Sequence, residues 1–205
     1  MSTMLTQDQI DAALAAGTPT LHEALGQRFA LDHGIKPIYP GARVVGRALT
    51  VQLKPADNLD LHKAIYEAEQ GDVLVATANG YMESGIWGEV TTVAAQSVGI
   101  AGFVLDGAVR DSREISELQF PVFARGLSIK GSGKNGGGSI GVPIICGGLL
   151  VNTGDIVVAD ADGIVIIPNN LFEEGLAKGK ARDEKEAQVM QKIREGQRAM
   201  DLLGF

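Results

Sequence analysis

The sequence predicts a mixed α/β fold with a parallel half, an antiparallel half and helices at both ends. Between about residues 73 and 125, short apolar segments alternate with segments of helical pattern, which is typical of parallel strands joined by right-handed βαβαβ crossovers. Between residues 140 and 168, four strand-like segments follow one another too closely for helices to intervene, so we expect antiparallel hairpins. Helices on both sides of these strands would give a layered α/β/β/α sandwich.

The composition indicates a single globular domain that spans residues 1–205. The chain is 45% hydrophobic and shows no linker or internal repeat, which suits one sizeable core. Its 18 Lys and Arg against 25 Asp and Glu give a net charge of −7, the wrong sign for a nucleic-acid surface. No apolar stretch is long enough to cross a bilayer, and the first residues lack the basic and apolar regions of a signal peptide. We therefore expect a cytoplasmic protein that contacts neither nucleic acid nor membrane.

Residues 1–33 are predicted to form two short N-terminal helices. Thr6 with Gln9, and Thr20 with Glu23, have the three-residue spacing of a capping box. In that motif the hydroxyl accepts a free helix N–H and the longer side chain reaches back to another. Each pair therefore marks an expected helix start.

The central region is predicted to alternate strands and helices in the order that a parallel sheet requires. Segment 43–53 is rich in β-branched residues, and Asp57 and Asn58 after it are good helix N-caps. The elements expected to follow are strand 73–77, helix 86–97, strand 101–105, helix 112–118 and strand 121–125.

The last third is predicted to contain the hairpins and a C-terminal helix. Residues 170–205 are rich in Lys, Glu, Gln and Ala, which favours a helix, and we expect it to serve packing or assembly. The strand-like segments before it are 140–146, 147–151, 155–160 and 163–168.

Residues 131–136 match the Gly-x-Gly-x-x-Gly pattern of dinucleotide-binding loops. A dinucleotide site needs this turn to open a helix, whereas further glycines and the strand-like segment 140–146 follow here. We therefore predict a mobile loop that shapes a pocket or an interface. His62 is expected to be a structural residue of an amphipathic helix, and Cys146 a small buried apolar residue.

Two segments are predicted to meet at one edge of the parallel sheet. The first contains Gly88 and Glu89 at the start of a helix, and the second contains Asp106, Arg110 and Asp111 after the neighbouring strand. Because the carboxyl ends of parallel strands share an edge, we expect these side chains to converge in one crevice.

This combination of groups indicates a site for a small carboxylate and a divalent cation. A helix N-terminus and the Arg110 guanidinium suit a carboxylate ligand. The side chains of Glu89, Asp106 and Asp111 suit Mg²⁺ or Mn²⁺. The alternative is purely structural, with a turn at Asp106, a surface ion pair at Arg110 and a helix cap at Asp111.

A spacing in the middle of the chain resembles that of a known family. Glu89 is followed, after twenty residues, by Arg110-Asp111 within the segment GIWGEVTTVAAQSVGIAGFVLDGAVRD. The chain closely resembles the family that contains the 4-hydroxy-4-methyl-2-oxoglutarate/4-carboxy-4-hydroxy-2-oxoadipate aldolases and the regulator of RNase E activity A. The resemblance extends from about Tyr39 to Gly163, with several motifs in the same order and spacing.

The resemblance implies a role for each residue of the two segments. The family usually has Asp where this chain has Glu89, so the extra methylene is expected to reshape a water-mediated metal contact. Family members are homotrimers or homohexamers with sites at subunit boundaries, and we expect the same assembly here. By resemblance, the backbone of Gly88, Glu89, Val90 and Thr91 holds pyruvate, Arg110 contacts its carboxylate and keto oxygen, and Asp111 anchors the divalent metal.

The function that this resemblance implies is a divalent-metal-dependent, class II type pyruvate aldolase. It would cleave a 4-hydroxy-2-oxo acid to pyruvate and a second oxo acid, with oxaloacetate decarboxylation as a side activity. Arg110, Glu89 and Asp111 are the expected catalytic residues. A Schiff-base mechanism is disfavoured because it needs a desolvated lysine, and Lys130 and Lys134 lie in a glycine-rich, solvent-prone stretch. The alternative function is a non-catalytic regulator that binds an RNA-degrading enzyme.

Overall fold

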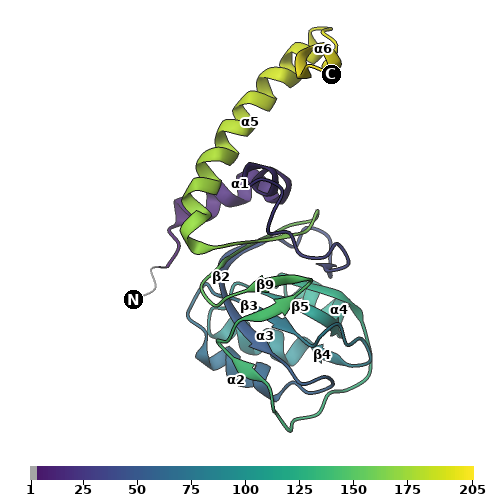
Figure 1. Ribbon diagram of the computed structural model, residues 1–205. Coiled ribbons are helices and arrows are strands. Elements are labelled where there is room, and N and C mark those ends of the chain that lie inside the picture. Colours follow the sequence, from purple (N-terminus) through teal and green to yellow (C-terminus); the bar gives the residue numbers. More distant parts are fainter. Residues whose placement is uncertain (1–3) are drawn as a thin grey trace.

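The computed structural model describes residues 4–205 and confirms the mixed α/β architecture (Figure 1). The strands are β1 (Lys36–Pro37), β2 (Val44–Gln52), β3 (Val73–Thr77), β4 (Gly85–Trp87), β5 (Gly102–Val109), β6 (Val122–Leu127), β7 (Ser139–Ile140), β8 (Ile144–Cys146), β9 (Leu149–Val151), β10 (Ile156–Ala159) and β11 (Ile164–Ile167). The helices are α1 (Gln7–Ala24), α2 (Leu59–Glu67), α3 (Glu89–Ser97), α4 (Ser112–Glu117), α5 (Phe172–Arg194) and α6 (Ala199–Leu203).

One curled sheet holds most of the strands, in the order β1-β6-β5-β3-β2-β10-β11, and strand β2 joins its two halves. Residues 48–52 of β2 pair in parallel with β3, whereas residues 44–47 pair antiparallel with β10. Strands β3, β5 and β6 continue the parallel half, and β11 completes the antiparallel half. Both predicted halves are therefore present.

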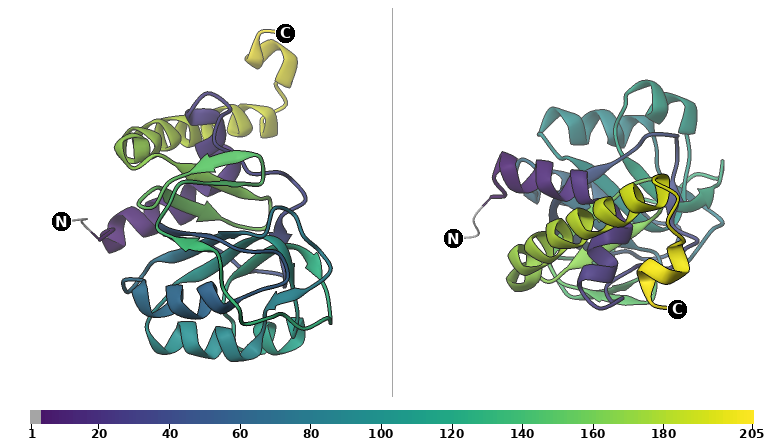
Figure 2. Two further views of the ribbon diagram at one scale, coloured as in Figure 1. Left: turned by 60° about the horizontal axis from the view of Figure 1, so that its bottom comes forward. Right: turned by 90° about the horizontal axis from the view of Figure 1, so that it is seen from above.

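Helices lie on both sides of the strands (Figure 2). Helices α2, α3 and α4 cover the parallel half, and α1 with α5 packs over β10 and β11 on the opposite side. Strands β3 and β5 are buried along their whole length, as expected where a parallel sheet is covered on both faces. In the larger core, Trp87 stacks on Phe103 with ring centroids 4.0 Å apart. This packing gives the end of β4 a rigid support.

The terminal helices are largely as predicted. Helix α1 is kinked at Gly17, where φ is 74°, so both predicted short helices are present. The capping box at Thr6 is confirmed, whereas the one at Thr20 is wrong, because its hydroxyl donates to Asp183 Oδ1 on α5 at 3.0 Å. The distal part of α5 extends away from the strands (Figure 1). Within residues 4–205, no helix has the length and apolar character needed to cross a bilayer.

Two boundaries near the parallel edge differ from the prediction. The predicted helix 86–97 begins only at Glu89, because the residues before it form β4, which pairs in parallel with the end of β5. That pairing extends β5 to Val109 instead of residue 105. Asp106 therefore lies within a strand and not in the loop after it.

The hairpin half has shorter strands than predicted. Segment 140–146 is interrupted between β7 and β8, where Gly141 has a φ of 74° and Pro143 follows. Gly147 and Gly148 were expected in a strand but form the turn of the β8–β9 hairpin, with φ of 51° and 79°. Glycine adopts such angles without steric cost, so this pair suits a turn.

Candidate active site

A pocket of about 250 Å³ opens at the edge where β4 passes into α3. Its walls are β4, the first turn of α3, Arg110, the start of α2 and residues of the glycine-rich loop. Elements that are far apart in the sequence therefore meet here, and the rigid sheet supports one side of the pocket.

The first turn of α3 lines this pocket and carries backbone N–H groups that no helix carbonyl accepts. The N–H of Gly88 donates to Thr91 Oγ1 at 2.9 Å, and Thr92 Oγ1 donates to the Gly88 carbonyl at 2.9 Å. These bonds fix the backbone bend before the helix. The N–H groups of Val90 and Thr91 follow in the first turn, where a helix has no acceptor of its own and its dipole favours an anion. Of the four residues whose backbone was expected to hold pyruvate, Gly88, Val90 and Thr91 line the pocket, whereas Glu89 does not.

Arg110 and Asp111 lie against this turn because two glycines leave room for them. A Cβ at Gly85 would lie 2.8 Å from Arg110 Cβ, and one at Gly88 would collide with the Asp111 carboxylate. The N–H of Glu89 donates to Asp111 Oδ2 at 3.0 Å, and Arg110 Nε lies 3.5 Å from the same oxygen. Asp111 has a φ of 55°, a left-handed conformation that Asp and Asn tolerate better than most residues.

Arg110 also borders a second pocket of about 230 Å³. Asp111 lines this second pocket together with Ser128 and the apolar side chains of Leu127 and Ile129. The side chains of Arg110 and Asp111 are 44% and 35% exposed, so both are open to a ligand. The Asp111 carboxylate therefore lies beside the first pocket, and Arg110 is shared by both.

The structure adds Asn58 and Lys134, which the sequence analysis did not place in the site. Asn58 Nδ2 donates to the carbonyl of Ile86 at 2.7 Å, and Lys134 Nζ donates to Asn58 Oδ1 at 2.6 Å. Lys134 is exposed, as expected, yet its ammonium is bonded back to the pocket wall. The prediction that the glycine-rich loop shapes a pocket is confirmed.

His62, expected to be only structural, lines the pocket as well. Burial lowers the pKa of His62, and the charge of Lys134 lowers it further. The imidazole is therefore neutral at pH 7 and can accept a proton. The spacing of Asn58 and His62, four residues apart on α2, was the available signal, because residues at i and i+4 share one helix face.

The pocket is positively charged. Arg110 and Lys134 line it, and none of the residues that line it in the described part of the chain is Asp or Glu. Two such cations suit an anion that carries several oxygens.

A divalent cation would depend on Asp111 and Glu89. Among residues 4–205, no group of three or more His, Cys, Asp or Glu side chains is placed so that it could hold a metal ion. Mg²⁺ commonly keeps several waters and uses only one or two carboxylates. The donor set therefore fits a hydrated Mg²⁺ or Mn²⁺ and not a metal enclosed by protein ligands.

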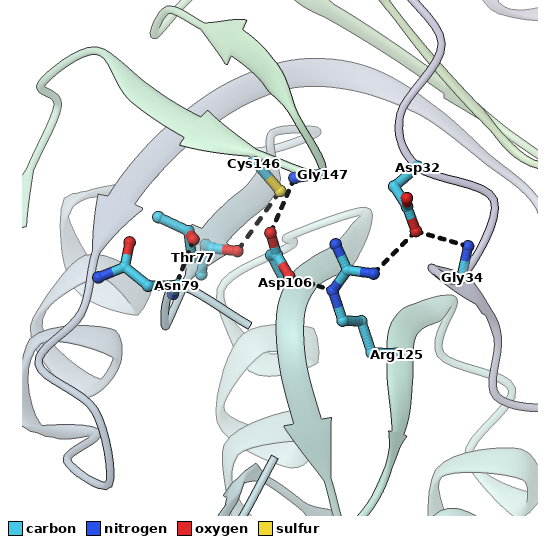
Figure 3. Close-up of polar contacts among 9 residues, drawn as sticks. Asp32, Gly34, Thr77, Asn79, Asp106, Arg125, Cys146 and Gly147 are labelled. Carbon is cyan, nitrogen blue, oxygen red and sulfur yellow. Dashed lines mark hydrogen bonds and ion pairs between the residues drawn. The ribbon is translucent and has the colours of Figure 1, made fainter. Parts of the chain in front are cut away.

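Asp106 does not join this site, contrary to the prediction. It is 7% exposed, pairs with Arg125 Nε and accepts the Gly147 N–H at 2.9 Å (Figure 3). Arg125 also donates to Asp32 Oδ1 at 2.8 Å, which ties the loop before β1 to the sheet. The β8–β9 turn thus covers the strand edge at Asp106.

Cys146 is buried near Asp106. Burial raises the pKa of the Cys146 thiol to about 12, in agreement with the expected buried apolar role.

Replacing Arg125 with methionine is expected to lower the free energy of unfolding by about 2 kcal/mol, because the buried Asp106 carboxylate loses its counter-charge. The value is below that of a fully buried pair because Arg125 is 26% exposed. Urea unfolding measures the change. The control is Arg113→Met, since Arg113 is 79% exposed in its pair with Glu114. Equal stability of the two variants would show that the pair between Arg125 and Asp106 does not stabilise the fold.

Comparisons with known proteins point to one family. A family model described as "RraA-like: Aldolase/RraA" matches residues 18–166. A protein of Halalkalibacterium halodurans named "Putative 4-hydroxy-4-methyl-2-oxoglutarate aldolase" is 45% identical over 80% of this chain and 79% of its own length.

Two solved structures share the fold. An uncharacterized protein from Pseudomonas syringae pv. tomato has a TM-score of 0.87 and 29% identity, covering 98% of this chain and 95% of its own. The RNA-processing inhibitor RraA from Thermus thermophilis has a TM-score of 0.68 and 31% identity, covering 74% of this chain and 92% of its own.

Proposed function

The chain belongs to the RraA-like family of aldolases and RraA proteins, and on this premise we propose that it is a divalent-metal-dependent pyruvate aldolase. Its substrates would be 4-hydroxy-2-oxo acids of the 4-hydroxy-4-methyl-2-oxoglutarate type, cleaved to pyruvate and a second oxo acid, with oxaloacetate decarboxylation as a side activity. The observation that carries this proposal is the cationic pocket at the start of α3, with the Asp111 carboxylate beside it.

In this proposal, the start of α3 and Arg110 bind the 2-oxo acid end of the substrate. The N–H groups of Val90 and Thr91 and the Arg110 guanidinium supply fixed donors for the carboxylate. When the bond between C3 and C4 breaks, negative charge develops on the keto oxygen. The charge of Arg110 stabilises that oxygen more strongly than it stabilises the neutral ketone, which lowers the barrier.

Asp111 would hold the metal, with Glu89 as the second carboxylate nearby. The bound ion would supply Lewis acidity at the keto oxygen. The Glu89 N–H donates to Asp111 Oδ2, so the Asp111 carboxylate is held in place by the same turn that binds the substrate.

His62 is our candidate for the proton transfer at the C4 hydroxyl. The imidazole is neutral because burial and Lys134 lower its pKa, and a neutral imidazole can take the C4 hydroxyl proton as the C3–C4 bond breaks. Returning that proton to C3 of the resulting enolate would complete the formation of pyruvate. Lys134 would bind the carboxylate at the other end of a dicarboxylate substrate.

We also propose that the chain assembles as a homotrimer or homohexamer.

The protein is expected to release pyruvate from oxaloacetate and from 4-hydroxy-4-methyl-2-oxoglutarate when Mg²⁺ or Mn²⁺ is present. Chelation should lower both rates at least about a hundredfold, because the ion stabilises the developing charge. A coupled lactate dehydrogenase assay measures pyruvate, with Arg110→Ala as the matched inactive control. Full turnover after exhaustive chelation would contradict the metal mechanism.

The second candidate function is a non-catalytic regulator of an RNA-degrading enzyme. It is favoured by the 31% identity to a protein described as an RNA-processing inhibitor and by the net charge of −7, which suits basic segments of a partner. Failure to release pyruvate from either substrate under any metal condition, together with inhibition of RNA cleavage, would favour this function over the aldolase.

A further inference from the structure

The loop that carries Lys134, residues 131–138, loses an unusually large amount of conformational entropy when it becomes ordered. Five of the eight residues from 131 to 138 are glycine, and glycine loses more conformational freedom on folding than any other residue. Lys134 has glycine on one side and Asn135 on the other, so its position depends on what holds its neighbours.

The Asp57 carboxylate holds the backbone on one side of Lys134. Asp57 Oδ2 accepts the N–H of Asn135 at 2.5 Å, and Oδ1 accepts the N–H of Gly136 at 3.0 Å. Asp57 is 4% exposed. Burial alone would raise the pKa of Asp57, but the backbone donors outweigh it and keep the pKa below its ordinary value. The carboxylate is therefore charged, and its hydrogen bonds are of the stronger, charge-assisted kind.

Further bonds from the same stretch secure the rest of the loop. Asn58 N–H donates to the Gly133 carbonyl at 3.1 Å, and Gly133 N–H donates to the Ala56 carbonyl at 2.7 Å. At the far end, Asp60 Oδ2 accepts the N–H of Gly138 at 2.7 Å. The loop is thus bonded to the start of α2 on both sides of Lys134.

We infer that Asp57 is a positioning residue, whose carboxylate binds the N–H groups of Asn135 and Gly136 and so holds Lys134 at the pocket, where it receives the second carboxylate of the substrate. The part that concerns substrate rests on the proposed function. Arg110 and Asp111 are carried by β5 and the turn after it, so they keep their places when the loop is released. Loss of Asp57 should therefore weaken substrate binding much more than it slows the chemical step.

The first test measures amide hydrogen exchange in residues 131–138. In Asp57→Asn, exchange at Asn135 and Gly136 should become at least about tenfold faster, because an amide cannot accept both N–H groups as the carboxylate does. The matched control is Asp155→Asn. Asp155 is 8% exposed and accepts the Asn152 N–H at 2.8 Å in a turn of the hairpin half, so its loss should leave the loop unchanged.

The second test is a double-variant cycle on the cleavage of 4-hydroxy-4-methyl-2-oxoglutarate, in which the second carboxylate does not take part in the bond that breaks. Asp57→Asn and Lys134→Met should each raise KM about tenfold with kcat within about threefold of wild type, and the double variant should match Lys134→Met alone. Asp155→Asn should change neither constant. If the effects of Asp57→Asn and Lys134→Met multiply, Asp57 does not act through Lys134 and the inference is overturned.

The two tests separate this inference from the aldolase proposal. If the wild-type protein turns over no oxo acid, the proposed function fails, and the exchange data alone then decide whether Asp57 holds the loop. Unchanged exchange in Asp57→Asn overturns the inference whether or not the protein is active. If Asp57→Asn does not give a cooperative melt, Asp57→Glu replaces it. The longer side chain keeps the charge but moves its oxygens away from the N–H groups of Asn135 and Gly136, so faster exchange at both and the same shift in KM are the expected result.

Discussion

Replacing Arg110 with lysine is expected to lower kcat/KM for oxaloacetate about a hundredfold and to leave the thermal melt unchanged. A guanidinium offers fixed, parallel donors to a carboxylate and to the oxygen that gains charge, whereas an ammonium acts as a point charge. Losing such a contact in a partly desolvated site costs about 3 kcal/mol in the transition state. Steady-state kinetics of Arg110→Lys and Arg110→Ala, beside melts of both, measure the effect.

Arg113→Lys is the matched control for this experiment. Arg113 lies on α4, close in sequence to Arg110, and pairs with Glu114 at 2.6 Å with 79% of its side chain exposed. Exposed ion pairs contribute at most about 1 kcal/mol, so this variant should keep its rate. If Arg110→Lys also remains within a few-fold of wild type, Arg110 is a surface residue and the aldolase proposal loses its central group.

Replacing Asp111 with asparagine is expected to abolish the stimulation of activity by Mg²⁺ or Mn²⁺, a loss of at least about a hundredfold in rate. The variant should nevertheless fold normally, because the residue has a φ of 55° and asparagine tolerates that conformation. Asn also keeps an oxygen that can accept the Glu89 N–H, which donates to Asp111 at 3.0 Å. Titration of activity with metal, beside a thermal melt, gives both quantities.

The control for Asp111 removes a charge from α4, the helix that follows Asp111. Glu114→Gln changes a carboxylate to an amide in the exposed pair with Arg113, and it should leave the metal response intact. A normal metal response in Asp111→Asn would show that another group anchors the ion. A cooperative melt lost in Asp111→Asn alone would favour the helix-cap interpretation of this residue.

Much of the parallel half could be predicted from the sequence because each element carries its own signal. Strand β3 has the predicted bounds, residues 73–77, since a continuous apolar run between turn residues is typical of a buried strand. The boundary between β4 and α3 could not be predicted. The run from Gly85 to Trp87 is too short for periodicity to separate strand from helix, and its pairing with Ala108 and Val109 of β5 decides it.

The candidate site was predicted in part for the same reason. The sequence places Gly88 at a helix start and Arg110 and Asp111 in the segment after a predicted strand, so their meeting at one sheet edge follows from the parallel order. The prediction that Asp106 joins the site is wrong because β5 continues beyond Asp106 and because Arg125 and Gly147 bind its two carboxylate oxygens. Nothing in the residues next to Asp106 reports those two partners.

The sequence by itself determined the mixed α/β class and the meeting of the α3 start with Arg110 and Asp111. Short-range sterics, periodicity and turn chemistry are carried by neighbouring residues, so these features can be read locally. Only the tertiary structure decided that Lys134 reaches Asn58, 76 residues earlier in the chain. Such a contact depends on which distant surfaces become buried together, and the hydrogen bonds that fix it form only after the two segments have been brought together.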